Sequence, residues 1–154
     1  MILLDTDIIA EMMKPNPDLR VEAWLAAEPG PSLFITTITE SELRHAAAMS
    51  SSSARREKFI AAIDAMLAED FHGRVLPFDA AAAIAYAAIA AESQNAGETL
   101  VQFDAQIAAI AKSRGAALAT RNPARFEGCG IETVNPWDDK LRVSSLRATG
   151  RARL

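Results

Sequence analysis

Short apolar segments alternate with longer segments of helical periodicity along the chain. Five of the short segments are typical of buried strands: Ile2–Leu4, Leu33–Thr36, Val75–Leu76, Ala117–Thr120 and Glu132–Val134. Between them, apolar side chains recur three and four positions apart, as they do on one face of a helix. Parallel strands need helical crossovers of this kind, because the chain must return to the same edge before the next strand begins. The pattern predicts an α/β fold, a three-layer α/β/α sandwich around a mostly parallel sheet.

Residues that start or end helices agree with this order. Pro15 should end the first helix, Asp79 should cap an alanine-rich helix, and Gly115 should end the helix that begins near Phe103. Alanine dominates the apolar fraction and aromatic residues make up only 6% of the chain, which favours closely packed helices over a β-sandwich. A chain of 154 residues suits one domain, which we expect to occupy residues 1–138.

Cysteine content and hydropathy restrict the compartment. Cys129 is the only cysteine, so no intramolecular disulfide can form and a cysteine-based zinc site is disfavoured. Asp5 and Asp7 interrupt the apolar start before a signal-peptide core could form. The longest uncharged apolar stretch, residues 80–91, is too short to span a bilayer. We therefore expect a soluble cytoplasmic protein with no membrane partner.

The charge is distributed unevenly. The net charge is −4, yet the last fifteen residues contain no acids and five basic residues: Lys140, Arg142, Arg147, Arg151 and Arg153. We expect residues 139–154 to form a basic, disordered tail. Such a tail either contacts phosphates or is simply a solvated terminus, and the second role is the commoner one.

Three carboxylates are candidates for a site, although each also has a purely structural explanation. Asp5 ends the first strand, where it can cap the helix that begins at Thr6 or Asp7. Thr39 and Glu42 match a capping box, in which the glutamate bonds back to the cap residue. Asp104 lies in the first turn of its helix, where a negative charge favours the helix dipole.

Taken together, Asp5, Glu42 and Asp104 indicate chemistry. One strand end and two helix N-termini converge over the carboxyl edge of a parallel sheet, where ligands bind in such folds. Carboxylates about 5 Å apart repel each other by about 3 kcal/mol per pair at an effective dielectric near 20, so a positive charge must hold them. Oxygen ligands suit Mg²⁺ or Mn²⁺, which would orient a water for attack on phosphorus.

Five sequence motifs resemble those of PIN-domain nucleases, specifically the VapC-like toxins of bacterial toxin–antitoxin pairs. They are ILLDTDII, ITESELRHA, VQFDAQIAAIA, LATRNPARFEGCGI and VNPW, in this order over residues 1 to about 138. In this resemblance Asp5, Glu42 and Asp104 match the first three acids of the family. Thr6 and Thr120 match polar positions that line the family's site.

The chain departs from the family pattern at two positions. Asp7 stands where members often have Asn or Ser, and Asn122 stands where many have a fourth acid. Asn122 can ligate a metal through its carbonyl or through a water, but it brings no charge. It also reads as a helix N-cap before Pro123, which needs no ligand. We therefore expect one firmly held metal, with Asp7 as the nearby residue able to compensate.

The resemblance implies a function and partners. It implies the toxin of a toxin–antitoxin pair, an endoribonuclease dependent on Mg²⁺ or Mn²⁺. Its substrate would be cellular RNA, with tRNA or rRNA as examples, and a small antitoxin would hold it inactive. Family members commonly form homodimers.

Two other functions remain open from the sequence. Asp5 and Asp7 also resemble the start of haloacid-dehalogenase-like phosphatases, with Asp5 as nucleophile and Asp138-Asp139 as a final acidic pair. That reading leaves Glu42 and Asp104 without a role. The other alternative is a PIN-fold binding or regulatory module in which Asn122 has weakened catalysis.

Overall fold

The computed structural model describes residues 1–138, so the predicted basic tail, residues 139–154, lies outside the described residues. The strands are β1 (Ile2–Leu4), β2 (Leu33–Thr36), β3 (Val75–Leu76), β4 (Ala117–Ala119) and β5 (Thr133–Val134). The helices are α1 (Thr6–Met12), α2 (Leu19–Ala27), α3 (Thr37–Ala48), α4 (Ser53–Glu69), α5 (Ala80–Asn95) and α6 (Gln102–Arg114). Two short 3-10 turns, η1 (Gly30–Ser32) and η2 (Pro123–Phe126), precede β2 and follow β4.

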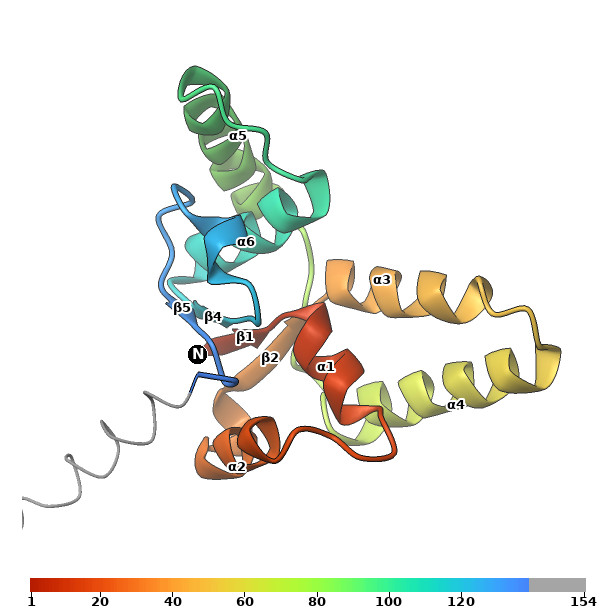
Figure 1. Cartoon of the computed structure of the whole chain (residues 1–154). Helices are drawn as coiled ribbons and strands as arrows, with labels where there is room; N and C mark the ends of the chain where they lie inside the picture. Colours follow the sequence, from red (N-terminus) through yellow and green to blue (C-terminus); the bar gives the residue numbers. More distant parts are fainter. Residues whose placement is uncertain (139–154) are drawn as a thin grey trace, which may run out of the picture.

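The five strands form one sheet in the order β3-β2-β1-β4-β5, and each neighbouring pair is parallel. The predicted α/β fold is therefore confirmed. The chain leaves β1 in one direction toward β2 and β3 and later returns on its other side as β4 and β5 (Figure 1). The order thus reverses between β1 and β4, and ligands bind at the carboxyl ends of strands beside such a switch point.

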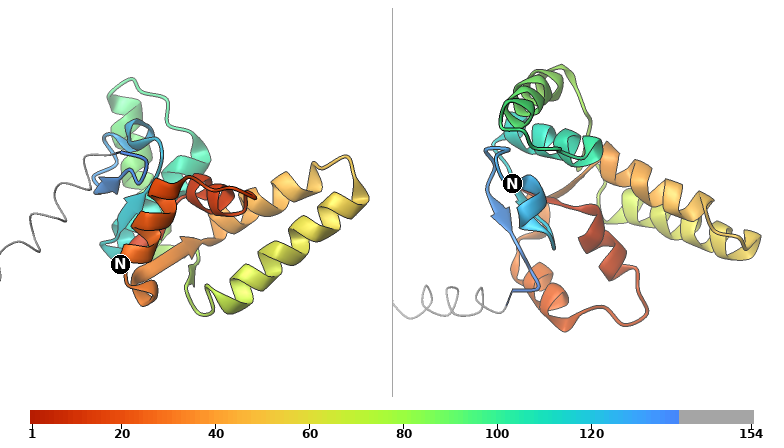
Figure 2. Two further views of the ribbon diagram at one scale, coloured as in Figure 1. Left: turned by 60° about the horizontal axis from the view of Figure 1, so that its bottom comes forward. Right: turned by 45° about the horizontal axis from the view of Figure 1, so that its top comes forward.

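Helices cover both faces of the sheet, and successive residues of the central strand serve opposite faces. Leu3 packs with α5 and α6 in one core, whereas Leu4 packs with α1 to α4 in the other. Small side chains let α5 lie close along α6, where four consecutive residues from Ala108 to Ala111 are fully buried. Helices α3 and α4 form a hairpin that extends away from the sheet (Figure 2). Within residues 1–138, no helix is both long and apolar enough to cross a membrane.

Several expected helix boundaries are confirmed. The side chain of Asp79 caps α5 by accepting a hydrogen bond from the Ala82 N–H at 3.0 Å. Gly115 ends α6 in the left-handed conformation, with a φ of 60° that a side chain would disfavour.

The predicted capping box is wrong. Helix α3 begins at Thr37, and Thr36 caps it by accepting a hydrogen bond from the Thr39 N–H at 3.0 Å. The first turn of α3 starts directly at the end of β2, where Thr36 and Thr39 are both fully buried. Glu42 therefore lies in the second turn, and its side chain is free for other contacts.

Candidate active site

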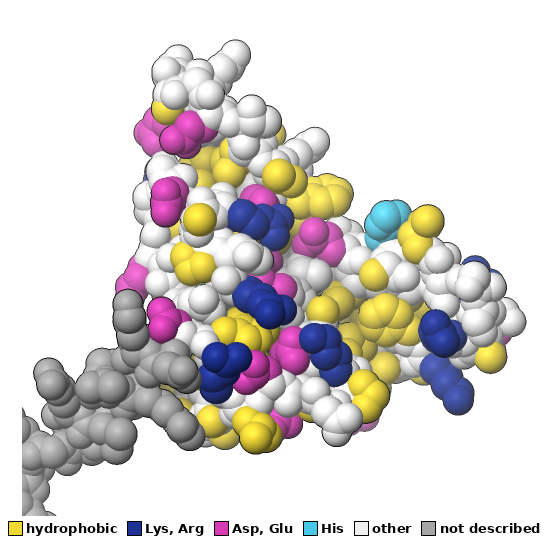
Figure 3. Space-filling view, viewed as in Figure 1, with side chains coloured by type: hydrophobic (Ala, Val, Ile, Leu, Met, Phe, Trp, Pro, Cys, Tyr) yellow, Lys and Arg dark blue, Asp and Glu magenta, His cyan; other side chains and the backbone are white. Residues whose placement is uncertain are grey.

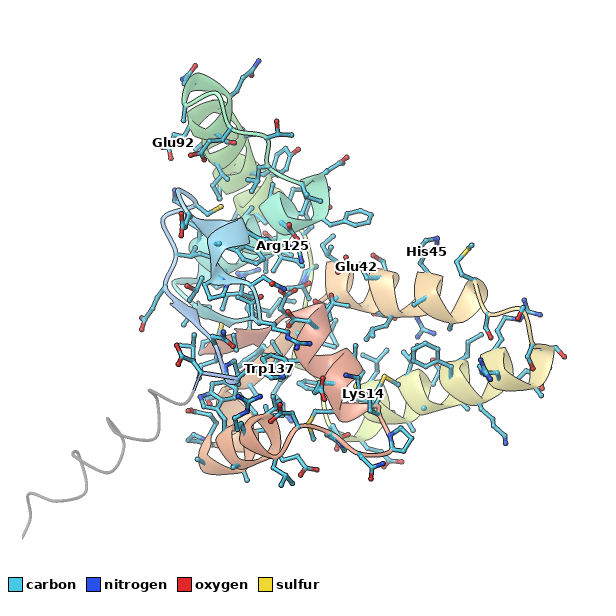
Figure 4. The ribbon with its side chains drawn as sticks, in the orientation of Figure 1. Lys14, Glu42, His45, Glu92, Arg125 and Trp137 are labelled. Carbon is cyan, nitrogen blue, oxygen red and sulfur yellow. The ribbon has the colours of Figure 1, made fainter. Side chains whose placement is uncertain are left out.

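The residues expected at the carboxyl edge lie near the switch point, close enough for their charges to interact. Asp5 directly follows β1, Thr120 directly follows β4, and Glu42 and Asp104 approach from α3 and α6. Glu42 and Arg125 both lie beside the start of α1 (Figure 4). Parallel strands and helices that begin at the same edge produce this convergence, although the residues are far apart in sequence.

Asp5 is buried and fully hydrogen-bonded. It is 4% exposed, one carboxylate oxygen accepts from the Thr6 N–H at 2.8 Å, and the other accepts from the Thr120 hydroxyl at 2.7 Å. Asp5 is thus the cap of α1, which begins at Thr6. Burial raises the pKa of Asp5, and the Thr120 hydrogen bond partly offsets that rise.

Glu42 is half-buried and contacts the first residue of α1. The Thr6 hydroxyl donates to Glu42 Oε2 at 2.5 Å. Burial raises the pKa of Glu42, and the charges of Asp5 and Asp104 raise it further. These like charges act on one another, so the acids form one electrostatic group.

Asp7 supplies a fourth carboxylate. The sequence analysis predicts only a supporting role for it. Its Oδ2 accepts from the Arg121 N–H at 2.9 Å, whereas its Oδ1 is buried without a hydrogen-bond partner. Burial, followed by the charge of Asp5, raises the pKa of Asp7 to about 6. A buried oxygen without a partner is costly unless something positive approaches it.

Asp104 has a partner that sequence reasoning missed. It is 3% exposed, and both of its oxygens are bound by the Arg125 guanidinium, with Nε–Oδ2 at 2.8 Å and Nη2–Oδ1 at 2.5 Å. The positive charge required beside these acids is thus partly supplied by the chain itself. Arg125 lies 21 residues from Asp104, and no local spacing rule connects the two.

Asn122 lies at the surface, two residues after Thr120. It occupies the cap position of η2 before Pro123, as expected, but its side chain makes no capping hydrogen bond. Its N–H donates to the Thr120 hydroxyl oxygen at 3.2 Å. Thr120 is fully buried and connects the Asn122 backbone to Asp5, which gives it a structural role at the switch point.

The acids suit a hard divalent cation in their chemistry but are not gathered around one. All donors are carboxylate oxygens, which Mg²⁺ and Mn²⁺ prefer, and Asp7 Oδ1 lacks a partner. Within residues 1–138, however, no group of three or more His, Cys, Asp or Glu side chains is close enough to hold a metal ion. The guanidinium of Arg125 binds both carboxylate oxygens of Asp104, which is one of the three expected ligands.

Comparison with known proteins supports the sequence resemblance. The family model described as PIN domain matches residues 2–127. VapC ribonuclease Y4jK of Sinorhizobium fredii is 37% identical over 138 residues, which cover 90% of this chain and 99% of that protein. Toxin FitB of Neisseria gonorrhoeae is 34% identical over 139 residues, which cover 90% and 100%. The crystal structure of FitAcB from Neisseria gonorrhoeae is similar with a TM-score of 0.78 and 33% identity, over 89% of this chain and 99% of that one.

A parallel sheet with acids at its switch point, together with the matched model, defines the class: the chain belongs to the PIN-domain family. Within that family its relatives are VapC and FitB, which confirms the resemblance to VapC-like toxins. Membership of this family removes the phosphatase alternative built on Asp5 and Asp7. Asp139 of its proposed acidic pair lies outside the described residues.

Proposed function

We propose that this chain is the toxin of a VapC-type toxin–antitoxin pair and an endoribonuclease that depends on Mg²⁺ or Mn²⁺. The observation that carries the proposal is the convergence of Asp5, Glu42 and Asp104 at the switch point, where the first two are buried enough for their pKa to be raised. Buried like charges are costly, and proteins retain them mainly at functional sites. The 37% identity to a VapC ribonuclease supports the same reaction.

Asp5, Glu42 and Asp104 are the residues that would hold the cation, with Asp7 beside them. When bound, a divalent cation supplies a polarised water and neutralises charge on the phosphate. The chain's own contribution is positioning. Thr120 fixes the orientation of Asp5, and Thr6 fixes that of Glu42, through the hydroxyl hydrogen bonds at 2.7 and 2.5 Å.

The proposed partners follow from the relatives. The relative FitB of Neisseria gonorrhoeae is named a toxin, which supports a small antitoxin as the partner of this chain. Cellular RNA, such as tRNA or rRNA, is the proposed substrate, and the cytoplasm is the proposed compartment. A homodimer is also proposed, as the resemblance to VapC-like toxins implies. Sedimentation of the isolated chain tests the dimer.

Cleavage of RNA by the purified chain, freed of any partner, tests the activity. We expect cleavage with Mg²⁺ or Mn²⁺, loss of cleavage in EDTA, and recovery when the metal is added back. Glu42→Gln should reduce the rate by about 100-fold or more, because it removes one charge from the cation's ligands. Glu40→Gln is the matched control, since Glu40 lies two residues earlier on α3 and pairs with Arg44 at the surface.

Two outcomes would contradict the proposed reaction. Cleavage that persists in EDTA, or full activity in Glu42→Gln, would exclude the carboxylate-bound metal. No cleavage of any RNA, combined with tight binding to a small protein encoded nearby, would instead favour the PIN-fold binding module.

A further inference from the structure

Arg125 occupies an unusual position for a surface arginine. Its guanidinium reaches from η2 to Asp104 on α6 and binds both carboxylate oxygens of that side chain. Among the ion pairs described within residues 1–138, it is the one that reaches an acid of the site. A two-point contact between guanidinium and carboxylate is among the strongest side-chain hydrogen bonds.

The charge of Arg125 also acts on the other three acids. Burial raises the pKa of Asp5, Asp7 and Glu42, and the positive charge of Arg125 opposes that rise in each case. One guanidinium therefore serves as counter-ion to four carboxylates. A divalent cation at this site would bind the same oxygens. It would offset the same negative charges with two positive charges instead of one.

Two features allow the guanidinium to leave Asp104 without unfolding its turn. The side chain of Arg125 is 45% exposed, and its hydrogen bonds among the described residues are those to Asp104. The turn itself is held by other contacts: Phe126 is buried, and the Arg125 N–H donates to the Asn122 carbonyl at 3.1 Å. Rotation about side-chain bonds is therefore enough to free the guanidinium.

A free guanidinium at this place would face an incoming phosphodiester. Lys and Arg side chains lie among Asp and Glu side chains over the middle of this face of the molecule (Figure 3). The planar fork that binds the two oxygens of a carboxylate also fits two oxygens of a phosphate.

We propose that Arg125 is a tethered counter-ion that changes partners: it holds Asp104 in the metal-free protein, yields Asp104 to the divalent cation, and then binds a phosphate of the RNA. This inference rests on the proposed metal-dependent cleavage of RNA. In the described residues Arg125 already binds both oxygens of Asp104, one of the proposed cation ligands. The exchange of partners predicts effects of opposite sign on cation binding and on RNA binding when Arg125 is replaced.

Calorimetric titration of Mn²⁺ into the full chain tests the first half. Arg125→Gln should bind Mn²⁺ about tenfold more tightly than the wild type, because the competing charge is gone. Arg121→Gln is the matched control: it removes the same charge four residues away, from a side chain that stacks on Trp137, 5.2 Å from Arg121 Cζ to the ring centroid. Its affinity for Mn²⁺ should stay within about twofold of the wild type.

Fluorescence anisotropy with a short, labelled phosphorothioate RNA tests the second half, at saturating Mn²⁺. Arg125→Gln should bind this RNA about tenfold more weakly, and Arg125→Lys should fall between it and the wild type, because lysine keeps the charge but loses the fork. A direct check uses the wild-type protein. The NMR signal of the Arg125 Nε–H should shift when Mg²⁺ is added, as the contact with Asp104 breaks.

Each half can fail separately. Unchanged or weaker Mn²⁺ binding by Arg125→Gln would overturn the competition, since Arg125 would then organise the site and not compete for it. Tighter Mn²⁺ binding with unchanged RNA binding would overturn the transfer to phosphate. If neither the wild type nor Arg125→Gln binds Mn²⁺, the proposed metal-dependent function itself fails. If a variant does not fold, the NMR titration of the wild-type protein still tests the inference. An Arg125 Nε–H signal that does not shift at saturating Mg²⁺ overturns it.

Discussion

Three helices of the described chain begin with a capping aspartate, but the three caps lie in different surroundings. Asp18 on α2 and Asp79 on α5 are partly exposed and pair with Arg20 and Arg114. The hydrogen bonds from Arg20 lower the pKa of Asp18 to about 2, and the Ala82 N–H lowers that of Asp79. Asp5 on α1 has the same capping contact, yet burial raises its pKa.

The charged cap therefore stabilises the fold at Asp18 and Asp79, whereas at Asp5 the fold retains a cap whose charge burial disfavours. A capping hydrogen bond favours the charged carboxylate in all three places, whereas removal from water disfavours it only where the side chain is buried. At Asp5 the burial is the larger effect. A carboxylate retained in spite of that cost is typical of a functional residue.

The largest expected effect is on catalysis, and it compares two caps directly. Asp5→Asn should lower the rate of RNA cleavage by about 100-fold or more, because asparagine can still cap α1 but brings no charge to the cation. Asp79→Asn should leave the rate unchanged. Since the charge of Asp5 is disfavoured by burial, Asp5→Asn should unfold at a temperature no lower than that of the wild type. Equal rates of RNA cleavage for Asp5→Asn and Asp79→Asn would contradict the proposed difference between the two caps.

The next effect concerns the first turn of α1, where the Thr6 hydroxyl contacts Glu42 on α3. Thr6→Val removes the hydroxyl that donates to Glu42 and keeps the shape of the side chain. We expect kcat to fall about tenfold, because Glu42 loses the contact that orients it. Thr6→Ser should recover most of the rate. Loss of activity in both variants would show that packing of Thr6 matters and not its hydroxyl.

A smaller effect is expected on stability at the structural cap of α5. Asp79→Ala removes both the hydrogen bond to the Ala82 N–H and the pairing with Arg114. The melting temperature should fall by about 3 °C, as is usual for the loss of a helix cap. Asp79→Asn keeps the cap and should recover part of that loss. Cleavage of RNA should be unaffected in either variant, in contrast to Asp5→Asn.

The smallest effect is a pH dependence at the cap of α2. The pKa of Asp18 is lowered in the folded chain, so its charge stabilises the protein above about pH 4, and this contribution is lost as the pH falls toward 2. The difference in melting temperature between the wild type and Asp18→Asn should therefore shrink over that range. Added salt should also reduce it, since the pair with Arg20 is partly exposed. A difference that grows with acidity would contradict the assignment.

Local patterns were sufficient for much of the fold. The strand positions, the cap at Asp79 and the stop at Gly115 follow from periodicity and backbone preference, which depend on neighbours within a few residues. The start of α3 did not follow, because Thr36 and Thr39 both suit a cap. Helix α3 begins at the residue after β2 ends, which makes Thr36 the cap.

The sequence by itself determined the parallel α/β architecture and brought Asp5, Glu42 and Asp104 to one edge, since alternating strands and helices allow few other arrangements. The tertiary structure decided what surrounds each of them. It buried Asp5, joined Thr6 to Glu42, and set Arg125 against Asp104, across 21 residues of chain. These contacts depend on desolvation and charge between distant segments, which no local spacing specifies.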